Sequence, residues 1–226
     1  MKTSAFRRTW LAFVLGAICA TSLQSVAALA AVGNAAVQPA QLQQAYTWHD
    51  GKRERTAWLD PQLLAEFITG KKLASNSAAS AAPSVKAVYA QAATVGKAKG
   101  GVQLWRMSAG VPSDQAAQNL SAKSATGATP AGYSPILRDS SSTSGRMRAL
   151  PGNIIVYLNP DWDRAAVDAW ALRRQLEIID KLEIGKNVYV IKTQPGLAAL
   201  TLANALYQSG EVVAAIPNWW QEVHTK

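Results

Sequence analysis

Residues 153–217 decide the fold, and they read NIIVYLNPDWDRAAVDAWALRRQLEIIDKLEIGKNVYVIKTQPGLAALTLANALYQSGEVVAAIP. The stretch opens on a buried-strand pattern at 153–158, which lies between Pro151-Gly152 and Asn159-Pro160. The remaining patterns predict, in order, a helix from about Asp163, a strand over 176–182, a strand over 188–191, a helix that opens at Pro195-Gly196, and a strand over 211–216.

Apolar spacing supports both helices. The first carries an apolar stripe and has Asp161 or Asp163 available as its N-cap. The second shows i, i+3, i+4, i+7 spacing from Ala199 to Leu206. The order βα-ββ-αβ, with two right-handed crossovers around a central hairpin, predicts a ferredoxin-like sandwich with two helices on one face of an antiparallel sheet. The expected fold class is therefore α+β, with β-hairpin segments and flexible linkers in front of the sandwich.

The N-terminal half predicts hairpins and linkers. Asp50-Gly51 separates two strand-like runs and favours a two-residue turn, so 46–70 is expected to be a β-hairpin segment. Its second strand is expected to end at Leu59, before a separate apolar piece that Asp60-Pro61 introduces. Residues 71–134 are expected to be low-complexity linkers around a hairpin at 85–108, with strands at 85–89 and 102–107 and a tip at 96–101. The other divisions are 1–30, a loose lead at 31–45, the patterned domain at 135–218, and a tail at 219–226.

Residues 1–30 have the pattern of a secretory signal. Basic residues precede an apolar run of about a dozen residues, and Ala28-Leu29-Ala30 predicts cleavage after Ala30. An uncleaved anchor is the alternative, but the run is shorter than the ~20 residues that a membrane span needs. Ile18 directly before Cys19 disfavours a lipoprotein. We therefore expect a periplasmic or secreted protein with no stable membrane insertion after cleavage.

The length and the net charge of the chain limit the functions that it can have. The chain has 226 residues and a net charge of +9, which fits one medium domain or two small ones. Loss of 1–30 removes three of 23 basic residues, none of 14 acidic ones and the single cysteine, which leaves +6. A chain without cysteine has no disulfide framework and no cysteine-based zinc site. The basic residues are dispersed and do not alternate with aromatic residues, which argues against a nucleic-acid partner.

The sequence offers little for catalysis. It contains no G-x-S-x-G elbow, no P-loop and no G-x-G-x-x-G after a strand. The acidic residues between Asn159 and Asp168 resemble a calcium loop only loosely, because they lack its central glycine and its terminal glutamate. We therefore expect a protein that is not an enzyme, with no catalytic residues, no metal and no cofactor.

The end of the chain is the best candidate for binding. Two tryptophans follow the strand-stopping Pro217, and a polar tail follows them. Tryptophan is enriched at binding hot spots, because one rigid side chain buries a large area. The alternative is that one or both tryptophans close the protein's own core. The residues expected to bind a partner are Trp219, Trp220, Gln221, Glu222, Val223, His224, Thr225 and Lys226.

Four segments between residues 150 and 220 carry a family resemblance: Leu150-Pro151-Gly152 through Val156, residues 162–176, Gly196-Leu197 with 202–206, and Ser209-Gly210-Glu211-Val212-Val213 through Pro217-Asn218-Trp219-Trp220. The last, a Ser-Gly-x-Val strand that ends in Pro-Asn-Trp, is the most specific. Together they resemble the N-terminal prodomains of bacterial subtilisin-like serine proteases. The hairpin at 46–68 is similar to segments found upstream of such prodomains.

This resemblance implies a ferredoxin-like domain that assists folding of the protease and then inhibits it. It also implies that the tail lies in the active-site cleft, with residues 223–226 in successive subsites. The sequence departs from the family at its end, because it stops where a protease domain would begin. We therefore expect an exported, non-catalytic protein that acts in trans as inhibitor or folding chaperone of a separately encoded subtilisin-like protease. An envelope adaptor or structural binding protein, and the remnant of a protease gene, are the alternatives.

Overall fold

A computed structural model describes residues 42–68, 84–124 and 132–222. It is a mixed α+β structure with two sheets, and every strand pair in these sheets is antiparallel. All of the described residues fall within one compact unit, Gln38–Lys226. The predicted signal with its cleavage site, most of the predicted lead at 31–45 and most of the predicted linker at 71–84 lie outside the described residues.

Six elements of the C-terminal part follow the predicted order. They are β7 (Asn153–Tyr157), α4 (Arg164–Arg173), β8 (Ile178–Lys181), β9 (Val188–Lys192), α5 (Leu197–Gln208) and β10 (Ala214–Pro217). Their four strands form one sheet in the order β10-β7-β9-β8. The last strand begins later than the sequence predicts, because residues 211–213 form an irregular approach to it.

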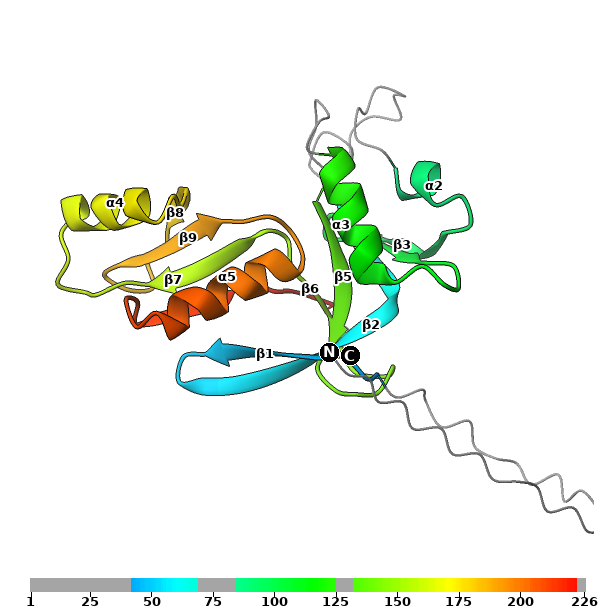
Figure 1. The fold of residues 1–226 in the computed structure, drawn as a ribbon, viewed down its shortest axis with the longest axis horizontal. Coiled ribbons are helices and arrows are strands. Elements are labelled where there is room, and N and C mark those ends of the chain that lie inside the picture. The colour runs from blue at the N-terminus through cyan, green and yellow to red at the C-terminus, as the bar shows by residue number, and fades with distance from the viewer. Residues whose placement is uncertain (1–41, 69–83, 125–131, 223–226) are drawn as a thin grey trace, which may run out of the picture. The chain divides into compact units, whose positions relative to one another are not determined.

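Both helices of this part pack on the same core. The Asp163 side chain caps α4 by accepting a hydrogen bond from the Ala166 N–H at 2.8 Å. Val167 and Trp170 of α4, Leu200 and Ala203 of α5, and Ile154 of β7 are buried together in one hydrophobic cluster. Figure 1 shows α4 and α5 with strands β7 and β9.

The second sheet has seven strands: β1 (Ala45–Asp50), β2 (Arg53–Phe67), β3 (Ala93–Lys99), β4 (Val102–Arg106), β5 (Gly132–Arg138), β6 (Met147–Ala149) and β11 (Trp220–Gln221). The order is β11-β6-β5-β2-β4-β3, and β1 pairs with the first part of β2. β11, from the end of the chain, therefore joins a sheet built mostly from the N-terminal half.

The predicted hairpin at Asp50-Gly51 is present. Asp50 pairs with Arg53 across the turn, and Gly51 has a positive φ of 60°, a conformation that glycine adopts without strain. The prediction that its second strand stops at Leu59 is wrong, because β2 continues to Phe67. Its pairing with β5 skips residues 61–63, and this irregularity accommodates Pro61 within a strand.

Two predictions for residues 71–134 are also wrong. The expected strand at 85–89 is a short helix, α2 (Val85–Val88), which Ser84 caps by accepting from the Ala87 N–H at 3.2 Å. The expected linker at 109–134 contains helix α3 (Ser113–Ser124) and the start of β5. Small side chains such as Ala116 and Ala117 are buried against the sheet, so a composition typical of linkers here belongs to a packed helix. The predicted strand at 102–107 is β4, but its hairpin partner is β3 at Ala93–Lys99.

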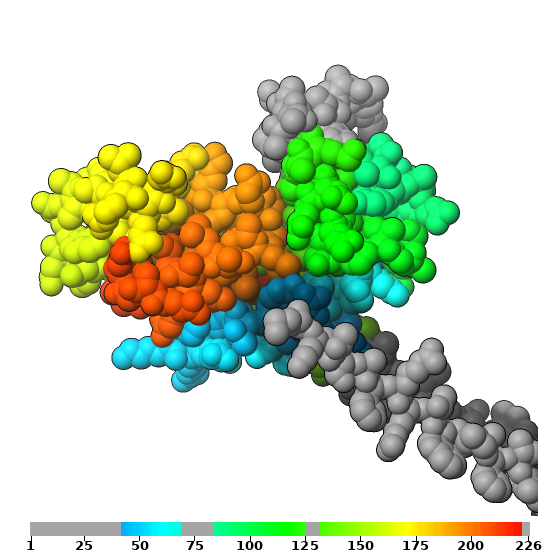
Figure 2. Space-filling view, viewed as in Figure 1, coloured from blue at the N-terminus to red at the C-terminus, as the bar shows by residue number. Residues whose placement is uncertain are grey.

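Three hydrophobic clusters hold the described residues together. The first lies between the four-stranded sheet and helices α4 and α5, and it extends to Trp48 and Leu137 of the seven-stranded sheet. The second lies between α3 and the seven-stranded sheet around Leu120 and Trp105. The third lies on the opposite face of that sheet, around Ile136. In Figure 2 the green surface of α3 lies beside the orange surface of the first residues of α5, where a groove is lined by both.

Candidate functional site

The predicted binding residues begin inside the fold. Trp220 pairs with Ala149 and Gln221 with Arg148 in the β11–β6 ladder, and the Glu222 N–H donates to the Met147 carbonyl at 3.2 Å. The last four predicted residues, Val223, His224, Thr225 and Lys226, lie outside the described residues. The structure therefore fixes where the predicted tail starts, at the edge of the seven-stranded sheet.

Trp219 packs into the core between the two sheets. Its ring centroid lies 5.4 Å from that of Trp48, at an interplanar angle of 59°. The Arg148 guanidinium carbon lies 5.9 Å from the centre of the Trp219 ring, within the range of a cation–π contact. Burial lowers the pKa of Arg148 from its ordinary value. The Nε1 atom of Trp219 and the Nε atom of Arg148 are both buried, and neither has a hydrogen-bond partner among the described residues.

Trp220 packs on the opposite side of the sheet. It is half-buried against the cluster that contains Ile136, Leu63 and Ala149. Trp220 begins β11, whereas Trp219 precedes that strand and packs against the cluster that contains Trp48, so the two adjacent tryptophans enter two different cores. The alternative reading of the sequence, in which tryptophans close the protein's own core, thus describes both side chains, although each keeps some exposed surface.

Sequence reasoning did not single out Trp48 or Arg148 as neighbours of this pair. Trp48 lies on the hairpin strand β1 and Arg148 on β6, far from residue 219 in the sequence. One weak signal in the sequence could have indicated such a contact. A hairpin strand that carries a large apolar side chain such as tryptophan needs another surface on which to bury it. No pattern in the sequence states which surface that is.

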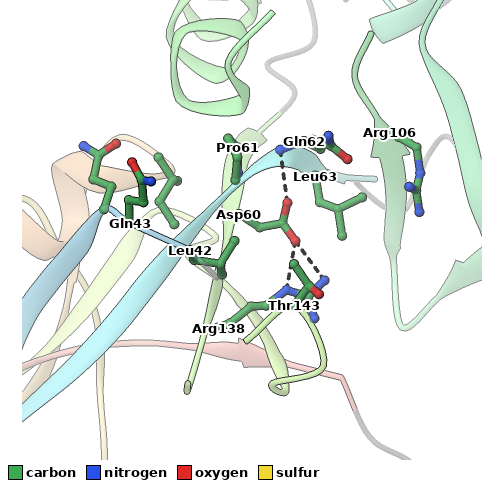
Figure 3. A pocket seen from close by; sticks show the side chains of 11 residues that line it. Leu42, Gln43, Asp60, Pro61, Gln62, Leu63, Arg106, Arg138 and Thr143 are labelled. Carbon is green, nitrogen blue, oxygen red and sulfur yellow. Dashed lines mark hydrogen bonds and ion pairs between the residues drawn. The ribbon is translucent and has the colours of Figure 1, made fainter. Parts of the chain in front are cut away.

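A pocket with a volume of about 680 Å³ lies at the irregularity of β2 (Figure 3). At its base Asp60 and Arg138 form an ion pair with an Nη2–Oδ2 distance of 2.8 Å. The Arg138 Nε–H also donates to Asp60 Oδ2 at 2.8 Å, and the Gln62 N–H donates to Asp60 Oδ1 at 3.0 Å. Both carboxylate oxygens of Asp60 thus accept hydrogen bonds. Asp60 is the one carboxyl group among the described residues that line the pocket, so none there is free to act as a general acid or base.

His49 also has a structural position. Its ring stacks on Tyr207 of α5 with centroids 4.1 Å apart, and its buried Nδ1 atom has no hydrogen-bond partner in the part of the chain that the structure describes. Within the described ranges no group of three or more His, Cys, Asp or Glu side chains is placed to hold a metal ion. None of the described helices is long and apolar enough to cross a membrane.

Comparison with known proteins adds no family. No protein-family model, no curated protein and no solved structure matches this chain. The resemblance to subtilase prodomains therefore rests on the residues between 150 and 220 that carry it.

Proposed function

We propose that this protein acts in trans on a subtilisin-like serine protease, as its inhibitor, its folding chaperone or both. The observation that carries the proposal is the resemblance between residues 150 and 220, above all the sequence Ser209-Gly210-Glu211-Val212 that leads through β10 into Pro217-Asn218-Trp219. The protein itself would be exported and non-catalytic, and it would bind the protease through a sheet face and through its tail.

The arrangement of the C-terminal part supports this proposal. We interpret the element order β7-α4-β8-β9-α5-β10, with sheet order β10-β7-β9-β8, as a ferredoxin-like sandwich. In that interpretation both helices cover one face, since they share a core with Ile154 of β7 and Ile191 of β9. This is the kind of domain that the resemblance implies.

The opposite face of this sheet is a suitable docking surface, and we call it the outer face. Ile155 and Tyr157 alternate with the core residues of β7, so they point away from the helices. Val190 and Val188 lie directly across from them on β9 and share that face. These four side chains lie outside the three hydrophobic clusters of the described residues. Val188 and Val190 are buried, at 2% and 8% exposed, whereas Ile155 and Tyr157 are half-buried and are the two that a partner can reach. An apolar sheet face of this kind can pack against surface helices of a partner.

The first test measures inhibition of a purified bacterial subtilisin by the full chain and by a variant that lacks residues 223–226. This deletion leaves β11 and its pairing with β6 in place, which a deletion from residue 221 would not. We expect the deletion to weaken inhibition at least about tenfold, because extended main-chain contacts in the cleft would be lost. Equal inhibition by both proteins would overturn the tail contact and leave docking by the outer face.

The second test addresses the outer face. Tyr157→Glu places a charge on that face, and Leu172→Glu is the matched control because Leu172 is 80% exposed on α4. We expect Tyr157→Glu to weaken inhibition and to reduce the recovery of active protease on co-expression, whereas the control leaves both unchanged. Circular dichroism verifies that both variants fold. If the full chain neither inhibits a subtilisin nor raises the recovery of one expressed without its prodomain, the proposal is wrong.

A further inference from the structure

The pocket at the irregularity of β2 is enclosed by parts of the chain that lie far apart in the sequence (Figure 3). Residues 42–44 form one wall, which is held in place because the Leu42 N–H donates to the Ser141 carbonyl at 2.7 Å and the Gln44 carbonyl accepts from the Leu59 N–H at 2.8 Å. The last residues of β4 and β5 line the pocket as well. Its volume of about 680 Å³ falls within the range of small-molecule sites, about 300–1,000 Å³.

Part of the lining is apolar surface that the hydrophobic clusters do not use. Leu42 and Leu59 are buried, at 8% and 3% exposed, but neither belongs to any of the three clusters of the described residues. Both line the pocket together with Leu63, which connects the pocket to the third cluster. These three side chains offer an apolar surface on which the apolar part of a ligand would lose its contact with water.

The ion pair at the base of the pocket adds no net charge. Arg138 carries five N–H donors, and its Nε and Nη2 atoms contact Asp60 while its Nη1 atom donates to the Gly145 carbonyl at 2.7 Å. Both groups are buried and each neutralises the other. The charge of a ligand therefore depends on the remaining charged residue of the lining.

That residue is Arg106, an exposed side chain at the end of β4. Its neighbours on the two adjacent strands are Leu63 of β2 and Ala93 of β3, and both are apolar. Among the residues that the structure describes, Arg106 has no ion-pair partner. Figure 3 shows it on β4, across Leu63 from the Asp60–Arg138 pair. The pocket thus combines one unpaired guanidinium with an apolar floor.

We propose that this pocket binds a small amphipathic organic acid, an anion with one carboxylate on an apolar body. The carboxylate pairs with Arg106, because the planar guanidinium group matches a carboxylate with two parallel hydrogen bonds. The apolar body lies on Leu42, Leu59 and Leu63. The neutral pair at the base provides no counter-charge for a second acidic group. This site is separate from the outer face and does not depend on the proposed protease partner.

The probe is naphthylacetate, titrated into the full chain at low salt and followed by isothermal titration calorimetry. Naphthylacetamide has the same apolar body without the charge, and acetate has the charge without the apolar body. We expect saturable binding of naphthylacetate and binding at least about tenfold weaker for each of the other two compounds, since each lacks one of the two contributions.

The variant Arg106→Gln tests the assignment of the charge, and we expect it to weaken the binding of naphthylacetate about tenfold. Arg53→Gln is the matched control, because Arg53 is also an exposed arginine of the seven-stranded sheet, lies outside the pocket lining and has no ion-pair partner within the described ranges. The control is expected to bind as the natural chain does. Circular dichroism verifies that both variants fold.

The proposal is overturned if the natural chain shows no saturable binding of naphthylacetate, or if the amide or acetate binds equally well. It is also overturned if Arg106→Gln binds like Arg53→Gln. A peptide that ends in a free phenylalanine carboxylate carries the same chemistry at the end of a protein chain. Tighter binding of this peptide than of naphthylacetate would show that the occupant is a chain terminus of a partner, and the assignment to a small molecule would be wrong.

Discussion

The Asp60–Arg138 pair shows how one residue holds a strand irregularity in place. The side chains are only 6% and 10% exposed, and both Asp60 oxygens accept hydrogen bonds (Figure 3). Removing one member of a buried pair leaves the other charge uncompensated, which typically costs about 3–5 kcal/mol. We therefore expect Asp60→Leu to lower the free energy of unfolding by about that amount in urea titrations. The double variant Asp60→Leu/Arg138→Met is expected to be more stable than Asp60→Leu, and the reverse order would contradict this account.

Glu211 gives a pH dependence at the residue scale. Its carboxylate accepts from Arg174 Nε at 3.0 Å and from Trp170 Nε1 at 3.2 Å. The hydrogen bond from Arg174 is the main cause that holds the pKa of Glu211 below its ordinary value of 4.5. A lowered folded-state pKa stabilises the protein above the ordinary pKa, and this contribution is lost as the pH falls through the folded-state value.

The variant Glu211→Gln is therefore expected to reduce the loss of stability between about pH 5 and about pH 3. Urea unfolding midpoints at the two pH values measure this. Glu183→Gln is the control, because Glu183 is 86% exposed and its closest ion-pair distance is 3.9 Å. Identical pH dependence in Glu211→Gln and in the natural chain would refute the assignment.

At the scale of elements, the composition of α3 is typical of a linker, but the structure shows a helix that packs against a sheet. Leu120 is fully buried between α3 and the seven-stranded sheet. Leu120→Ala is expected to destabilise the protein by about 2–5 kcal/mol, because it removes buried methyl groups and leaves a cavity. The exposed Gln115 on the same helix provides the control, and Gln115→Ala should change stability by less than about 0.5 kcal/mol. A flexible linker would tolerate both substitutions equally.

Elements with strong periodicity were predictable from the sequence, and elements that depend on distant partners were not. β7, α4, β9 and α5 carry long apolar patterns between clear turn residues, so their local sequence determines them. α3 was missed because its buried face consists largely of Ala and Ser, residues that also fill linkers. β11 has only two residues, and its strand conformation comes from pairing with β6 rather than from local preference.

The same distinction explains the candidate sites. The tryptophan pair could be identified from the sequence because tryptophan is rare and the two residues are adjacent, which is a local signal. The small pocket that Val95 of β3 and Trp220 of β11 line was not predictable, since it forms only when the fold brings these distant residues together. The polar cluster at Asp60 is equally non-local, because its partner Arg138 lies 78 residues away.

For the whole molecule, the question is whether the two sheets unfold together. One hydrophobic cluster contains Trp48 of the seven-stranded sheet together with Ile154 of the four-stranded sheet and Leu200 of α5. Asn204 Nδ2 also donates to the Thr47 carbonyl at 2.8 Å across the same contact. Because the two parts share a core, we expect tryptophan fluorescence and far-UV circular dichroism to report one unfolding transition with the same midpoint.

Trp48→Ala removes the contact with Trp219 in this shared core, and we expect it to cost about 3–5 kcal/mol. Trp58 is the matched control: it is also a tryptophan of the β1–β2 hairpin, but it is only half-buried and lies outside the shared cluster. Trp58→Ala should therefore cost less. If the shared core couples the two parts, Trp48→Ala will lower the fluorescence and circular dichroism midpoints together and by more than Trp58→Ala does. Two separate transitions in the natural chain, or a larger loss for Trp58→Ala, would show that the cluster around Trp48 does not couple the sheets.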